Sequence, residues 1–104
     1  MVYELRRYRM TPGGAAAFEA GFRDELLPLL FEHGFDLCGA WTVAIGEGSE
    51  LQWLLRWPDW AARQAAYDAV RADPRNGRFR DRYLQHLVST SSELLTPTSF
   101  SPLN

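Results

Sequence analysis

The chain has 104 residues, of which 46% are hydrophobic, with a formal net charge of −2 and an isoelectric point near 5.6. This length predicts a single domain over residues 1–104. The acidic balance excludes a protein that binds nucleic acid by neutralising its phosphates. Every basic residue is an arginine, so a lysine Schiff base and a lysine general base are excluded as well.

Cysteine use and apolar runs indicate the compartment. Cys38 is the only cysteine, which excludes an intramolecular disulfide and is typical of a reducing, cytoplasmic setting. It lies in an apolar run, so we expect a small buried side chain rather than a nucleophile. Arginines at positions 6, 7 and 9 argue against a signal peptide, and no apolar run is long enough to predict a membrane span.

The first third of the chain predicts a strand and a helix. Val2–Met10 has β-favouring residues and is followed by the breakers Pro12-Gly13-Gly14. Residues 15–33 carry apolar side chains at the spacing of one helical stripe. Pro28 predicts a kink inside this helix, and Gly34 predicts its end.

The middle of the chain predicts a β-hairpin. Residues 37–45 and 51–57 are rich in β-branched, aliphatic and aromatic residues, and Gly46-Glu47-Gly48-Ser49 forms a turn signal between them. In the second run the odd positions, including Trp53 and Trp57, form an apolar face. We therefore expect two antiparallel strands joined by a short turn.

Two further helices are expected before the last strand. Asp59 is the predicted N-cap of a helix over Trp60–Ala72, which ends at Asp73-Pro74. Beyond Asn76-Gly77, apolar residues recur at four-residue spacing and predict a separate short helix.

The C-terminal residues predict one more strand and an extended tail. The strand is expected over residues 89–95. The tail, residues 96–104, contains two prolines, and Phe100 and Leu103 are its expected anchors.

The resulting β-α-β-β-α-β order predicts a ferredoxin-like α+β fold with an antiparallel sheet. Two helices would cover only one face of such a sheet. Tyr8, Trp41, Trp53 and Trp57 all lie on predicted strands, and we expect that two helices cannot cover all four rings. A second copy facing the sheet would cover them and enclose a central cavity, so the sequence predicts a homodimer.

Several motifs resemble the NIPSNAP family: residues 2–8 (VYELRRY), Pro12-Gly13, residues 39–46 (GAWTVAIG), Ala72-Asp73-Pro74 and residues 98–103 (TSFSPL). The resemblance implies a dimeric α+β barrel, in which two ferredoxin-like sheets pack face to face. The wider barrel superfamily includes cofactor-independent monooxygenases, haem-degrading enzymes and lactone isomerases. Where many members have a histidine in the third strand this chain has Trp53, which counts against an acid–base or metal role there.

The candidate ligand-binding residues are Glu4, Arg6, Tyr8, Trp41, Trp53 and His33. Glu4, Arg6 and Tyr8 share one face of the first strand and suit a polar small molecule, although a structural Glu4–Arg6 ion pair is the preferred explanation. Trp41 and Trp53 suit the walls of an aromatic site, or plain core positions.

The remaining polar residues predict no metal site and no bound cofactor. His33 lies at a predicted helix end, where capping explains it better than catalysis does. His86 is the only other histidine, which makes a poor metal signature. The arginines at positions 75, 78, 80 and 82 are offset by two aspartates and predict a solvated face.

Three functions remain open from the sequence. The first is a homodimeric barrel protein that binds a small apolar or aromatic molecule without transforming it. The second is a cofactor-independent monooxygenase or isomerase that uses Glu4, Arg6, Tyr8 or His33. The third is a structural or protein-interaction dimer with a filled interior.

Overall fold

The computed structural model describes residues 1–104, and the chain alternates strands and helical segments as predicted. Its elements are β1 (Val2–Met10), α1 (Ala15–Gly21), the π turn η1 (Phe22–Leu26), α2 (Leu27–Glu32), β2 (Asp36–Thr42), β3 (Ser49–Trp57), α3 (Trp60–Ala72), α4 (Pro74–Tyr83), the 3₁₀ turn η2 (Leu84–His86) and β4 (Leu87–Leu95).

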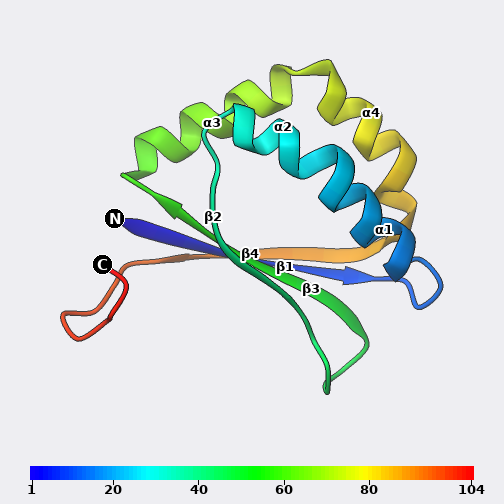
Figure 1. Cartoon of the computed structure of the whole chain (residues 1–104), viewed down its shortest axis with the longest axis horizontal. Helices are drawn as coiled ribbons and strands as arrows, with labels where there is room; N and C mark the ends of the chain where they lie inside the picture. The colour runs from blue at the N-terminus through cyan, green and yellow to red at the C-terminus, as the bar shows by residue number, and fades with distance from the viewer.

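The four strands form one antiparallel sheet in the order β2-β3-β1-β4. The central strands β1 and β3 pair along their whole length, from Val2 opposite Trp57 to Met10 opposite Ser49. All the helices lie on one side of the sheet (Figure 1). This confirms the ferredoxin-like topology that the element order predicts.

The core lies between the sheet and the helices. Tyr8, Trp53 and Trp57 point into it from β1 and β3 and are buried against side chains such as Phe22. The helices therefore cover three of the four rings, and these three need no second copy to bury them. Trp41, on the edge strand β2, is 54% exposed, so the prediction that the helices cannot cover all four rings is confirmed for this ring alone.

The first helical segment changes its winding just before Pro28. In a regular α-helix the Pro28 ring would clash with the carbonyl of Asp24, and Pro28 has no N–H to donate. The wider π turn η1 lies directly before it, and its Leu27 N–H bonds to the Phe22 carbonyl. The predicted irregularity therefore takes the form of a π turn, and Gly34, with φ of +86°, follows the helix end as predicted.

Asp73 separates the two helices of the second segment. α3 begins as predicted, with the Asp59 carboxylate accepting from Ala62 N at 2.7 Å. α4 begins earlier than predicted, at Pro74, because the Asp73 carboxylate accepts from Arg75 N at 2.9 Å and proline suits the first helical position.

The edge strand β2 is shorter than predicted and is irregular. It ends at Thr42, and residues 43–48 form the connection to β3. A bulge between Leu37 and Gly39 leaves Cys38 exposed, so the prediction of a buried cysteine is wrong. An edge strand has a partner on one side only, which reduces the burial of its side chains.

The opposite face of the sheet has no helix over it. The C-terminal residues turn back, with Ser101 N donating to the Thr98 carbonyl at 3.1 Å, and they lie against Tyr3 and Leu54. Leu103 lines this contact as predicted. Phe100 is 86% exposed, so its prediction as an anchor is wrong; it sits in the turn of the tail and points away.

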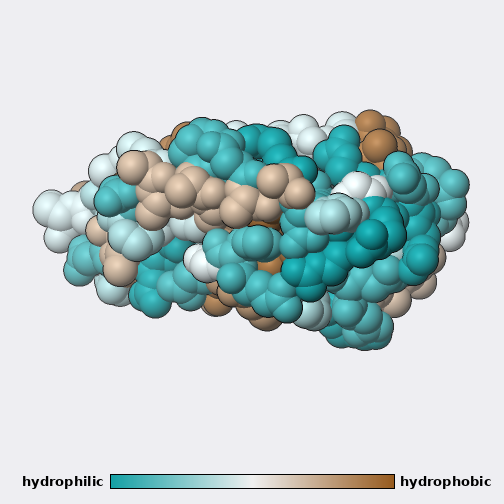
Figure 2. All heavy atoms as spheres, turned by 90° about the horizontal axis from the view of Figure 1, so that it is seen from above, coloured by the Kyte–Doolittle hydropathy of each residue, from teal (hydrophilic) through white to brown (hydrophobic).

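The helix side of the molecule has a mainly hydrophilic surface, broken by a moderately apolar band (Figure 2). The helices therefore bury their apolar stripes against the sheet and present polar residues outward. None of the helices has both the length and the apolar character that crossing a bilayer requires.

Candidate functional site

Glu4 lies at the centre of a buried polar network beneath the helices, and its side chain has no solvent exposure. Its Oε1 accepts from Trp57 Nε1 at 3.2 Å and from Arg63 Nε at 3.0 Å. Its Oε2 accepts from Arg63 at 2.9 Å, from the Tyr67 hydroxyl at 3.0 Å and from Arg6 at 3.3 Å. The carboxylate is thus fully occupied as an acceptor.

The network shifts the pKa values of its acidic groups in opposite directions. Burial alone would raise the pKa of Glu4, but the hydrogen bond and charge of Arg63, the charge of Arg6 and the Tyr67 hydroxyl outweigh it, and the pKa lies below its ordinary value of 4.5. Burial raises the pKa of Tyr67; Arg6 opposes this, and Glu4 reinforces it. At neutral pH Glu4 is therefore a paired anion and Tyr67 a neutral donor.

The Arg6 side chain lies on the sheet beneath the helices and bonds to residues of three elements. Its terminal nitrogens donate to the hydroxyls of Tyr8 at 3.3 Å, Tyr67 at 3.1 Å and Ser92 at 3.0 Å. Its guanidinium also lies 5.4 to 5.6 Å from the ring centroids of Tyr8, Trp53 and Tyr67. The Arg6 Nε is buried and has no hydrogen-bond partner.

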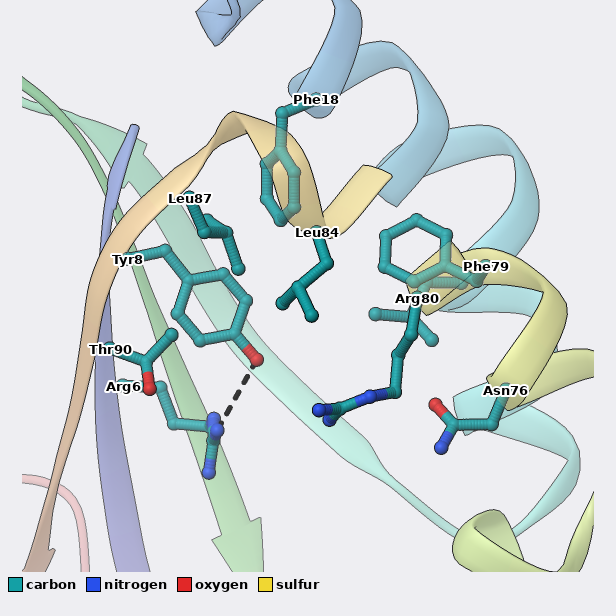
Figure 3. A pocket seen from close by; sticks show the side chains of 10 residues that line it. Arg6, Tyr8, Phe18, Asn76, Phe79, Arg80, Leu84, Leu87 and Thr90 are labelled. Carbon is teal, nitrogen blue, oxygen red and sulfur yellow. Dashed lines mark hydrogen bonds between the residues drawn. The ribbon is translucent and has the colours of Figure 1, made fainter. Parts of the chain in front are cut away.

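Two adjoining hollows of about 170 and 220 Å³ open above Arg6, and we call them together the sheet–helix cleft. Both are lined by Arg6, Tyr8, Leu26, Asn76 and Arg80. Figure 3 shows the Arg80 guanidinium and the Asn76 amide reaching from α4 into the first hollow, opposite Tyr8. The apolar wall of that hollow comes from Phe18, Leu26, Phe79, Leu84 and Leu87.

The lining of the cleft is positively charged. Arg6, Arg63, Arg71 and Arg80 line one or both hollows, and no aspartate, glutamate or histidine does. Glu4 lies behind this lining. The Arg80 side chain forms no hydrogen bond or ion pair with the rest of the chain. It is exposed, as the prediction of a solvated face requires, but it also lines both hollows, which that prediction did not include.

Four of the six candidate residues come together in this region. Glu4, Arg6 and Tyr8 share one face of β1 as predicted, and Trp53 lies beside them on β3. The Glu4–Arg6 ion pair is present at 3.3 Å, but as part of a larger network. Trp53 is only 2% exposed, and its buried Nε1 has no hydrogen-bond partner.

The other two candidates lie elsewhere. Trp41 pairs across from Gln52 and shares its face of the sheet, away from the main core. His33 lies at the end of its helix, as predicted, where it is the C-cap residue directly after α2, and its Nε2 lies 3.0 Å from Asp73 Oδ2. The pKa of Asp73 lies below its ordinary range. The largest cause is the hydrogen bond with Arg75, and the next is the hydrogen bond with His33. No cluster of three or more potential ligands exists for a metal ion.

The sequence analysis missed the helical half of the site. Arg63, Tyr67 and Arg71 recur every four residues on α3, and Asn76 and Arg80 are four apart on α4. This spacing places each set on one helix face. The same spacing, read together with the polar face of β1, would have predicted that the helices meet the strand through these side chains.

The sheet order and the single helix layer define a ferredoxin-like α+β protein with a cationic cleft. The chain belongs to the NIPSNAP family, whose model matches residues 3–102. It is 32% identical over 103 residues to Protein NipSnap homolog 3A of Homo sapiens; the match covers 98% of this chain and 41% of that protein. The chain thus spans about two fifths of the length of this relative.

Solved structures agree with this assignment. An uncharacterized NIPSNAP domain protein from Burkholderia xenovorans superposes with a TM-score of 0.90 at 29% identity, over 98% of this chain and 99% of that chain. A protein from Agrobacterium tumefaciens gives 0.93 at 26% identity, with both chains fully covered. SnoaB, a cofactor-independent oxygenase from Streptomyces nogalater, gives 0.66 at 16% identity over 97% of this chain and 96% of that chain, and shares the fold alone.

Proposed function

We propose that this protein binds a small molecule in the sheet–helix cleft. The observation that carries the proposal is a pair of adjoining hollows that join an apolar wall to arginine side chains, among them Arg6 and Arg80. Such a combination is typical of ligand sites, where a few polar groups orient an otherwise apolar ligand. The arginine donors also favour a ligand that accepts hydrogen bonds.

This site differs from the cavity expected between two sheets. Tyr8 and Trp53, two of the expected wall residues, face the helices of their own chain. Each chain therefore has its own cleft, and two copies would have two sites.

The lining favours binding over turnover. Isomerisation and proton abstraction need a base near the ligand. Neither hollow is lined by a carboxylate or an imidazole, and every oxygen of Glu4 is already engaged. The likeness to an oxygenase is one of fold, which many functions share.

Native mass spectrometry of freshly purified protein tests the proposal. We expect a bound small molecule on the wild type and much less on Leu84→Trp, which places a large ring at the rim of the first hollow. Gln85→Trp is the matched control, because Gln85 is the next residue, is exposed and lines neither hollow.

Equal ligand occupancy in the two tryptophan variants would contradict the location of the site. If the ligand is found, incubation with and without oxygen separates binding from oxygenation. A product that forms only with oxygen would contradict binding without turnover and would support the alternative that the protein is a monooxygenase.

We also propose that two copies pair through the open sheet faces. That face has no helix over it, and it carries Trp41 together with a mixture of charges such as Arg7 and Glu93, which interact within the chain. A domain of this size gains stability from covering such a face.

Sedimentation velocity at micromolar concentration tests the pairing. The wild type is expected to sediment as a dimer, and Trp41→Glu is expected to shift it toward monomer. Trp60→Glu, which replaces a part-exposed ring on α3, is the control and is expected to leave the dimer intact. A wild-type monomer would contradict this part of the proposal.

A further inference from the structure

We infer that the sheet–helix cleft recognises the carboxylate group of an organic acid, whose apolar part lies against Phe79 and Leu84. This inference rests on the proposed function that the cleft binds a small molecule, and it names the chemical class of that molecule. Charge, unused donors and the state of the neighbouring helix end support it independently.

The charge of the cleft is not balanced by its own chain. Glu4 pairs with Arg6 and Arg63, and Arg71 pairs with Asp68 at 3.0 Å. Arg80 has no such partner, and its guanidinium extends into the first hollow toward the side that holds Arg6 and Tyr8 (Figure 3). Two guanidinium groups that line one hollow without an acidic neighbour there favour an anion between them.

The first hollow also holds polar groups that carry no charge. The Asn76 amide reaches into it from α4, and the Tyr8 hydroxyl faces it from β1. Both groups can donate to a carboxylate oxygen in the hollow.

The helix end beside the cleft favours a carboxylate over a phosphate. Phosphate sites commonly use the free N–H groups at the start of a helix. α4 starts beside the cleft, but its first N–H groups are already bonded to Asp73. The Asp73 carboxylate accepts from Arg75 N at 2.9 Å, and the Asp73 carbonyl accepts from Asn76 N at 3.0 Å. The donors that remain are side chains, and the planar guanidinium fork matches the two oxygens of a carboxylate.

The test compares acids with their neutral amides. Isothermal titration calorimetry would use phenylacetate, indole-3-acetate, 4-hydroxybenzoate and octanoate, the amide of each, and inorganic phosphate. At least one acid is expected to bind about tenfold or more tightly than its amide, because a charge-assisted hydrogen bond is lost in the amide.

Two variants locate the interaction. Arg80→Gln is expected to weaken binding of that acid about tenfold and to leave binding of its amide unchanged. Arg78→Gln is the control, since Arg78 is exposed on the same helix and lines neither hollow. Because the Arg80 side chain is exposed and forms no hydrogen bond or ion pair within the chain, its replacement is expected to leave the melting temperature unchanged.

The outcomes separate this inference from the proposed function. If acids and amides bind equally, or if Arg80→Gln does not weaken the acid, the carboxylate inference is overturned while small-molecule binding stands. Tighter binding of inorganic phosphate than of every acid would also overturn it. If none of the acids or amides binds and native mass spectrometry finds no ligand, both proposals fail.

Discussion

The Glu4 carboxylate is completely buried, yet it faces two arginines, a tyrosine and a tryptophan that all donate to it. A buried charge is tolerated only when its partners replace the water it has lost. Glu4 therefore fixes the position of Arg6 and Arg63 and holds them beside the cleft. Its role is to arrange the cationic lining, while Arg6 and Arg80 are the groups that we propose contact a ligand.

Replacement of Glu4 by Gln is expected to lower the free energy of unfolding by about 3 kcal/mol, because the partly buried guanidinium groups of Arg6 and Arg63 lose their buried counter-charge. Urea denaturation measures this change. Glu93→Gln removes an exposed carboxylate paired with Arg7 on the open face, and it is expected to cost less than about 1 kcal/mol. Similar costs for the two variants would show that the buried network contributes little.

The same carboxylate predicts a pH dependence. The pKa of Glu4 in the folded chain is below its ordinary value of 4.5, so its stabilisation is complete above pH 4.5 and is lost as the pH falls through the folded-state pKa. The difference in stability between wild type and Glu4→Gln is therefore expected to shrink below about pH 4.5. A difference that stays constant from pH 7 to pH 3 would contradict the assignment.

At the scale of elements, α1 and α4 pack closely at Gly21. A Cβ at this position would overlap the ring of Tyr83. That ring is held by Phe79, with centroids 4.9 Å apart, and by a hydrogen bond from its hydroxyl to Glu25. The close approach of the two helices thus depends on a residue without a side chain, and it positions α4 and its Asn76 and Arg80 over the sheet.

Gly21→Ala is expected to lower the free energy of unfolding by about 1–3 kcal/mol through overpacking, although alanine is the better helix former. Gly77→Ala is the matched control within α4, where a Cβ would meet no atom within 4 Å. It is expected to raise stability by about 0.5–1 kcal/mol. Thermal unfolding of both variants tests the sign of each change, and a stabilising Gly21→Ala would contradict the packing described.

At the scale of the whole molecule, the two faces of the sheet are covered by different means. Helices cover one face and form the cleft with it, whereas the tail after β4 covers only one end of the other face. Tyr3 is 5% exposed because this tail lies over it. The rest of the open face is the surface through which we propose that two copies pair.

Deletion of residues 97–104 is expected to lower the free energy of unfolding by about 2 kcal/mol, because it uncovers the Tyr3 ring and Leu54. Phe100→Ser within the intact tail is the control. It is expected to have no measurable effect, since Phe100 is already largely exposed. Equal melting temperatures for the deletion and the full chain would contradict the contribution of the tail.

Local signals determined most of the fold. The alternation on β1, the cap at Asp59 and the stop at Gly34 are set by neighbouring residues, so the sequence alone predicts where these elements lie. The extent of β2 was predicted less well, because an edge strand ends where its partner and its bulge allow. The start of α4 was missed because Asp73 ends one helix and caps the next.

The site divides in the same way. That Glu4, Arg6 and Tyr8 share a face follows from the two-residue period of a strand, and the sequence by itself determined it. Only the tertiary structure decided which face of the sheet the helices cover. It also decided that Arg80 reaches the cleft while Arg78 does not. The reason is that side-chain direction along one element is a local property, whereas the enclosure of a cleft depends on contacts between residues about 70 positions apart.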